Sequence, residues 1–82
     1  MQGHLDRSRL REAIRELEGI VRDYPGTAQS VQAQLMAGSC YEAMRDRKKA
    51  TEAYRRVMTS APQSPFAAEA QQSLMRVMEA GQ

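Results

Sequence analysis

The sequence predicts an all-α protein, a stack of four helices in antiparallel hairpins, on three observations. Apolar residues recur at the 3.6-residue period of an α-helix through four consecutive segments. Pro25 and Pro62 lie 37 residues apart, and each follows a helical pattern. A fixed period of this length is typical of stacked repeat arrays. The connecting segments have only a few residues, which favours antiparallel neighbours.

The repeat is also visible in the residues around the two prolines. Downstream, the 37-residue offset places Ala33, Gln34, Glu42 and Ala43 on Ala70, Gln71, Glu79 and Ala80. Upstream, it places Ala13, Leu17, Ile20 and Val21 on Ala50, Tyr54, Val57 and Met58. Both halves of the chain are therefore expected to use the same kind of helical unit.

The first helix is expected over residues 8–24, because its apolar residues form one stripe. These are Leu10, Ala13, Ile14, Leu17, Ile20, Val21 and Tyr24. Pro25 disfavours the helical conformation of the residue before it, and Gly26 permits a turn. Residues 1–7 are expected to form a flexible terminus, of which 1–4 could be foreign to the natural protein. Residues 8–82 are expected to form one domain.

The second helix is expected over residues 28–45, with Thr27 as its N-cap. Its apolar residues surround most of its circumference, which is typical of a helix buried among others. We therefore expect it at the centre, with the first and third helices on either side. The third helix is expected over residues 47–61, with Ala50, Tyr54, Val57, Met58 and Ala61 on one face.

The fourth helix is expected over residues 65–80, where it would close the stack. Ser64 is a favourable N-cap, and Pro65 suits the first helical position. Five of the six methionines lie in the expected helices. Met36, Met44, Met58 and Met78 fall on or near apolar stripes and are expected to fill the core, whereas Met75 is the candidate for an exposed contact.

The composition argues against several classes of function. A net charge of +2 over 82 residues gives no strong electrostatic case for nucleic acid or an acidic membrane. The basic hinge at residues 45–49 lacks the aromatic side chains that stack on bases. No apolar run approaches the roughly 18 residues of a membrane span, and no signal peptide is visible. The single cysteine, Cys40, excludes an intrachain disulfide.

The sequence predicts no enzyme and no metal or other cofactor. His4 is the only histidine, and no other residue stands at metal-ligand spacing from it. Cys40 lies on the crowded side of the second helix and is expected to be a buried structural thiol. Glu12 and Glu16 share a helix face, but that face is polar and gives no cleft that would shift a pKa. No glycine-rich phosphate loop is present.

Five residues of the central hairpin resemble the tetratricopeptide repeat, a helix-turn-helix unit of about 34 residues. Gly38, Tyr41, Ala50, Tyr54 and Pro62 stand in register at its Gly, Tyr, Ala, Phe and Pro positions. Gly38 and Ala50 would be small where the two helices cross, and the tyrosines would fill the space beside them. The resemblance implies a right-handed α-solenoid, with one full repeat and half a repeat on either side.

The chain departs from the repeat pattern at three positions. Gln34 stands where the family often has Trp, and Ala37 where it often has Leu. Arg45 replaces a common Gly, which would cost roughly 1 kcal/mol if that position needs a positive φ. The 37-residue period resembles a bacterial subset of the family, similar to repeats of the Tol-Pal accessory protein and the outer-membrane-assembly lipoprotein. The compartment, periplasmic or cytoplasmic, is left open.

The resemblance implies a protein-interaction module, a segment of a scaffold or assembly factor. In this family the first helix of each repeat lines a concave surface that binds a peptide or a helix of a protein partner. The positions that map to this surface are Gln32, Leu35, Ser39, Glu42, Glu69, Gln72, Arg76 and Glu79. The alternative is self-association, for example as a homodimer, through the incomplete repeats at the two ends of the chain.

Overall fold

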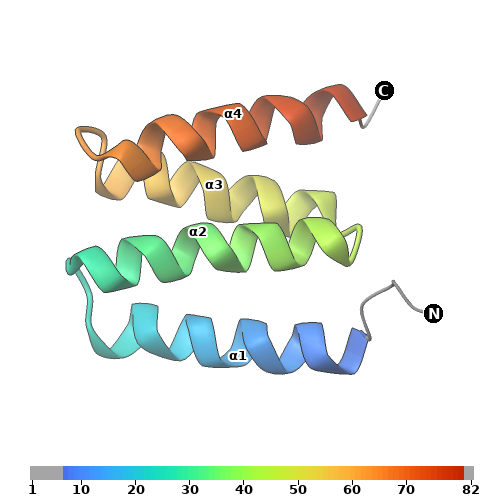
Figure 1. The fold of residues 1–82 in the computed structure, drawn as a ribbon, viewed down its shortest axis with the longest axis horizontal. Coiled ribbons are helices and arrows are strands. Elements are labelled where there is room, and N and C mark those ends of the chain that lie inside the picture. The colour runs from blue at the N-terminus through green and yellow to red at the C-terminus, as the bar shows by residue number, and fades with distance from the viewer. Residues whose placement is uncertain (1–6, 81–82) are drawn as a thin grey trace.

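In a computed structural model that describes residues 7–80, the chain folds into four α-helices (Figure 1). They are α1 (Arg7–Asp23), α2 (Ala28–Ala43), α3 (Arg47–Ser60) and α4 (Pro65–Ala80). No strand occurs within these residues. The prediction of an all-α fold of helical hairpins is therefore confirmed.

The helices form a stack in which α2 has the most neighbours (Figure 1). It packs against α1 on one side and α3 on the other, and it also contacts α4. Helix α4 packs mainly against α3, whereas α1 contacts no described helix except α2. This is the predicted arrangement, with the second helix at the centre and the fourth helix closing the stack.

The helix ends differ from the predicted bounds by one or two residues. Helix α1 begins at Arg7, which was assigned to the flexible terminus, and residues 1–6 of that terminus lie outside the described residues. It ends before Tyr24, whose side chain is 60% exposed and does not join the apolar stripe. Helix α3 ends at Ser60, one residue earlier than predicted, and α4 has the predicted bounds.

The end of α2 has a specific cause, because Arg45 adopts a left-handed conformation with φ of 64°. Its N–H donates to the carbonyl of Glu42, and the N–H of Asp46 donates to the carbonyl of Tyr41. This pair of bonds is a Schellman motif, which normally has glycine at the left-handed residue. The helix therefore stops at Ala43 rather than at residue 45, and Arg45 adopts the strained geometry expected of a substituted glycine.

The predicted N-caps of α2 and α4 are confirmed. Thr27 Oγ1 accepts a hydrogen bond from the N–H of Ser30 at 3.1 Å. Ser64 Oγ accepts one from the N–H of Ala67 at 3.3 Å, and Pro65 follows as the first residue of α4. Each side chain satisfies a backbone donor that has no partner inside its helix.

The main hydrophobic core lies between α2, α3 and α4. It contains Leu35, Ala50, Tyr54, Val57, Ala70, Leu74 and Val77. Tyr54, fully buried, is the largest side chain in it. On the other side of α2, Leu10 and Ile14 are the buried residues of α1. Because apolar residues face both sides of α2, this helix holds the two parts of the stack together.

The α2–α3 hairpin closes through a contact between Gly38 and Tyr54. A Cβ atom placed on Gly38 would lie 2.6 Å from Cε1 and 2.8 Å from Cδ1 of the Tyr54 ring. Real Cβ atoms do not approach other atoms this closely, so only glycine allows the ring to lie there. The glycine and tyrosine that the sequence analysis singled out are therefore two sides of one contact.

We predict that Gly38→Ala lowers the free energy of unfolding by about 1–3 kcal/mol, because the added methyl group displaces a fully buried ring. Urea unfolding monitored by circular dichroism would measure the effect. Gly19→Ala is the matched control, since its Cβ would meet nothing closer than 3.6 Å. It lies inside α1 and should stabilise the protein by about 0.5–1 kcal/mol. Equal effects of the two substitutions would contradict the close contact.

Candidate partner-binding surface

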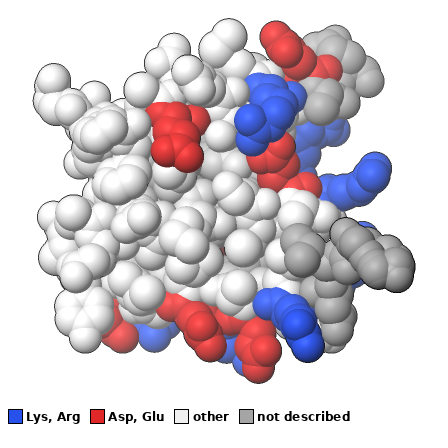
Figure 2. Space-filling view, in the orientation of Figure 1, with Lys and Arg blue, Asp and Glu red and all other residues white. Residues whose placement is uncertain are grey.

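Two stripes of exposed side chains lie on neighbouring helices, one on α2 and one on α4. On α2, Gln32, Met36 and Ser39 are exposed, and their spacing of four and three residues places them on one helix face. On α4 the exposed residues are Glu69, Gln72, Arg76 and Glu79. Figure 2 shows both helices in the orientation of Figure 1. On the side opposite the two chain ends, the surface over α2 and α4 carries few charged side chains. We call these two stripes the α2/α4 face.

An ion pair joins the two helices at this face. Arg76 Nε donates to Glu42 Oε2 at 2.9 Å, and Arg76 Nη2 donates to Glu42 Oε1 at 3.0 Å. The hydroxyl of Tyr54 donates to the same Glu42 Oε1 at 2.8 Å, and Ser39 Oγ lies 3.4 Å from that hydroxyl. Two-point pairing of Arg with a carboxylate fixes the orientation of both groups. Glu42 is thus bound by Tyr54 of α3 and by Arg76 of α4 at the same time.

The environment shifts the pKa values of this cluster in directions that follow from these bonds. The hydrogen bonds from Arg76 lower the pKa of Glu42 below its ordinary value, and the Tyr54 hydroxyl adds to this effect. The pKa of Arg76 is raised by the same pairing. Burial raises the pKa of Tyr54, and the bond to Glu42 raises it further. Near neutral pH the cluster therefore consists of a carboxylate, a guanidinium and a neutral phenol.

Six of the eight predicted site residues belong to the α2/α4 face. Glu42 is half-buried beside it, where it binds Arg76, and Leu35 lies beneath it. Leu35 is only 6% exposed and packs in the main core with Tyr54 and Leu74. Its side chain therefore supports the surface from inside and offers little area to a partner. Met36, the next residue, is 48% exposed and gives the face an apolar side chain.

Tyr54 has a second role at this surface that its sequence position did not predict. It was expected to fill space, and its ring does fill the core. The buried hydroxyl, however, donates to Glu42 and lies 3.4 Å from Ser39 Oγ, directly beneath the face. A buried tyrosine normally finds a hydrogen-bond partner for its hydroxyl. Ser39 and Glu42 are polar residues one and four positions after Gly38 on α2, so they were the signal in the sequence that could have predicted this partner.

The methionines also differ from expectation. Met36 and Met78 were assigned to the core but are 48% and 52% exposed. Met75 is 54% exposed, as predicted. Met44 and Met58 are half-buried, and Met58 packs against the main core.

No group of three or more His, Cys, Asp or Glu among residues 7–80 could hold a metal ion. Burial raises the pKa of the Cys40 thiol, which favours its unreactive protonated form. His4 lies outside the described residues. Within the same range, every helix is too short or too polar to span a membrane.

The fold and the Gly38–Tyr54 contact define a helical-hairpin repeat. A model of the tetratricopeptide repeat family matches residues 32–64, a segment that runs from within α2 through α3 to the residue before α4. This match supports the resemblance to that family over one repeat. No curated protein and no solved structure gives a significant match to the chain.

We predict that Glu42→Gln lowers the free energy of unfolding by about 0.5–1 kcal/mol at pH 7, as expected for a partly exposed ion pair. The folded state lowers the pKa of Glu42 below its ordinary value of 4.5. The carboxylate therefore stabilises the protein above that value, and the contribution disappears as the pH falls through the lowered pKa.

Urea unfolding of the wild type and the variant, from pH 7 down to pH 3, would test this. The difference between the two proteins should shrink toward zero at the acidic end of the series. A difference that stays constant with pH would mean that the charge on Glu42 contributes nothing to the fold.

Proposed function

We propose that this chain is a non-catalytic protein-interaction module, a segment of a scaffold or assembly factor. It binds a peptide or a helix of a partner protein across the α2/α4 face. The observation that carries this proposal is the Glu42–Arg76 pair, which two-point hydrogen bonding and the Tyr54 hydroxyl hold in one orientation between two exposed stripes. Tetratricopeptide repeats generally mediate protein–protein interactions, and one such repeat matches residues 32–64.

The chemistry of the face suits a mixed polar and apolar partner. The Arg76 guanidinium has five N–H donors, of which two bind Glu42, and its side chain is 59% exposed. The remaining donors can bind a carbonyl or carboxylate group of the partner. Gln32 and Gln72 add amide groups from the facing helices, and Met36 offers an adaptable apolar contact. A fixed charge pair of this kind orients a ligand more than it adds affinity.

A triple substitution tests the α2/α4 face directly. Changing Met36, Gln72 and Arg76 to Ala together should reduce partner capture from a native extract at least about tenfold, since apolar and Arg side chains dominate most interfaces. The free energy of unfolding should fall by no more than about 1 kcal/mol, because all three side chains are exposed. Immobilised protein and quantitative mass spectrometry of the captured proteins would measure the effect.

The matched control is a pair of exposed residues on α3, Glu52→Ala with Arg55→Ala, which lie away from both stripes. This variant should capture the same proteins as the wild type. Equal loss in the control and the triple variant, or no loss in either, would contradict binding at the α2/α4 face.

Self-association is the second candidate, and the outer side of α4 favours it. At the 37-residue offset, Met75 and Met78 take the positions of Gly38 and Tyr41, which α3 covers on α2. Leu17 of α1 takes the position of Tyr54. Met75 is larger than Gly38, and Leu17 is smaller than Tyr54. The two residues would therefore match in size if α1 of a second copy packed on α4. Unchanged capture by the triple variant, with an apparent mass that rises with concentration, would favour this candidate.

The bacterial origin and the absence of catalysis and nucleic-acid binding remain predictions. Within the described residues, the basic hinge engages in local contacts. Asp46 caps α3 by accepting from the N–H of Lys49 at 3.2 Å. Lys49 Nζ lies 5.8 Å from the centre of the Tyr41 ring, at a cation–π distance. These contacts support a structural role for the hinge.

A further inference from the structure

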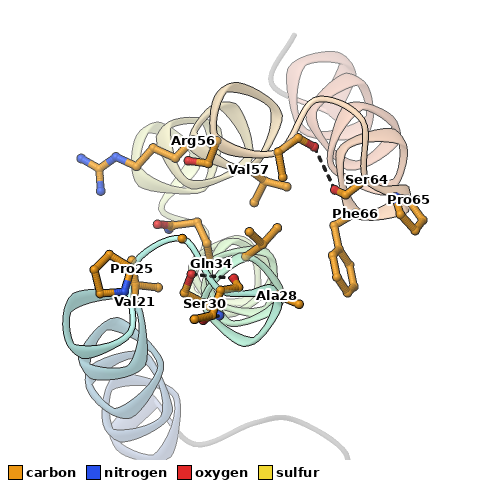
Figure 3. Close-up of a pocket in the computed structure, with 15 residues that line it drawn as sticks. Val21, Pro25, Ala28, Ser30, Gln34, Arg56, Val57, Ser64, Pro65 and Phe66 are labelled. Carbon is orange, nitrogen blue, oxygen red and sulfur yellow. Dashed lines mark hydrogen bonds between the residues drawn. The ribbon is translucent and has the colours of Figure 1, made fainter.

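A cavity lies at the open end of the α2–α3 hairpin. The two helices are joined near Arg45, so the start of α2 and the end of α3 lie at the opposite end of the hairpin. There the α1–α2 turn at Pro25 and the α3–α4 turn at Ser64 flank a cavity of about 460 Å³ (Figure 3). This volume falls within the range of protein ligand sites.

Gln34 lines this cavity and is the feature that points to a ligand. The residue is only 8% exposed, and no residue among 7–80 forms a hydrogen bond with its side-chain amide. Figure 3 shows the side chain leaving α2 toward α3 and the turn at Pro25. A buried amide without partners costs free energy, and it is the kind of group that fixes the orientation of a ligand in an otherwise apolar pocket.

A residue that departs from the repeat pattern lines the cavity. Gln34 occupies the position where the repeat pattern has Trp. A glutamine is smaller than an indole and carries a polar end, so the space that a ring would occupy stays open and gains an amide donor and acceptor. This site is distinct from the α2/α4 face, and the inference does not depend on the proposed function.

The rest of the lining supplies apolar walls, one charge and the hydroxyl side chains of Thr27, Ser30, Ser60 and Ser64. Val21, Val31, Val57 and Phe66 contribute hydrocarbon surface from all four helices. Among residues 7–80, Arg56 is the only charged residue that lines the cavity. Its side chain is exposed and extends from α3 on the same side of the cavity as Gln34 (Figure 3). A ligand for this site therefore combines an apolar group, a partner for an amide and a negative charge.

We propose that this cavity binds an extended peptide segment with an apolar residue followed by an acidic one. The apolar side chain enters the cavity, its backbone N–H and C=O pair with the Gln34 amide, and the acidic side chain faces Arg56. An extended residue presents its N–H and C=O on the same side, as in a β-ladder, and a glutamine amide can match both. A fatty acid would satisfy the walls and Arg56 but would supply no N–H for the amide.

The test follows the signal of the Gln34 side-chain amide, the group proposed to bind the peptide. Nuclear magnetic resonance of ¹⁵N-labelled protein would follow that signal during titration with two capped peptides, Ac-Gly-Leu-Glu-Gly-NH₂ and Ac-Gly-Leu-Gln-Gly-NH₂. The first should shift the Gln34 signal in a saturable way. The second should bind about threefold more weakly, which is the size expected for a partly exposed charge pair.

Variants separate the two recognition groups. Arg56→Gln should make the two peptides bind equally, whereas the neighbouring exposed control Arg55→Gln should preserve their difference. Gln34→Trp should fill the cavity and abolish binding, as judged from the backbone signals of Val57 and Phe66. If that variant does not fold, Gln34→Leu retains an apolar side chain without the amide and should weaken binding of both peptides about tenfold.

Several results would overturn the inference. One is that neither peptide shifts the Gln34 signal up to about 10 mM, a concentration beyond useful affinity. Another is that the glutamate and glutamine peptides bind the wild type equally. Full binding by folded Gln34→Trp would place the peptide elsewhere. Dodecanoate that shifts the Gln34 signal at lower concentration than the peptide would identify an amphiphile site instead.

Discussion

The ring of Tyr54 rests on the backbone of Gly38, and the rest of the structure depends on this contact. The absence of a Cβ atom at Gly38 lets α3 lie close enough to α2 for the ring to enter the core. From that position the hydroxyl reaches Glu42, one helical turn beyond Gly38. Glu42 in turn binds Arg76 of α4. One buried side chain therefore links the hairpin, the core and the exposed ion pair.

The departures from the repeat pattern have local consequences that this contact tolerates. Arg45 ends α2 in a left-handed conformation, which costs roughly 1 kcal/mol relative to glycine. Gln34 lines a cavity at the open end of the hairpin, and its buried amide has no hydrogen-bond partner among the described residues. In a domain of this size such costs are a sizeable part of the stability. The core around Tyr54 offsets them because it gathers buried residues from three helices.

Local signals made much of the fold predictable. The caps Thr27 and Ser64 and the order of the helices follow from short-range spacing, which the sequence displays directly. The burial of Leu35 and the exposure of Met36 do not follow from this spacing. Periodicity shows on which side of a helix the apolar stripe lies, but not how wide the buried part of that stripe is. That width depends on where α4 lies. The Glu42–Arg76 pair joins residues 34 positions apart, so only the packing of α4 against α2 and α3 brings it together.

The core holds the surface pair in place through Tyr54, and a double-mutant cycle measures this coupling. Tyr54→Phe removes only the hydroxyl, and Arg76→Ala removes the guanidinium. Because both groups bind the Glu42 carboxylate, urea unfolding of the two single variants and the double variant should give a coupling energy of about 0.5–1 kcal/mol. Additive effects within about 0.3 kcal/mol would show that the core and the α2/α4 face are independent.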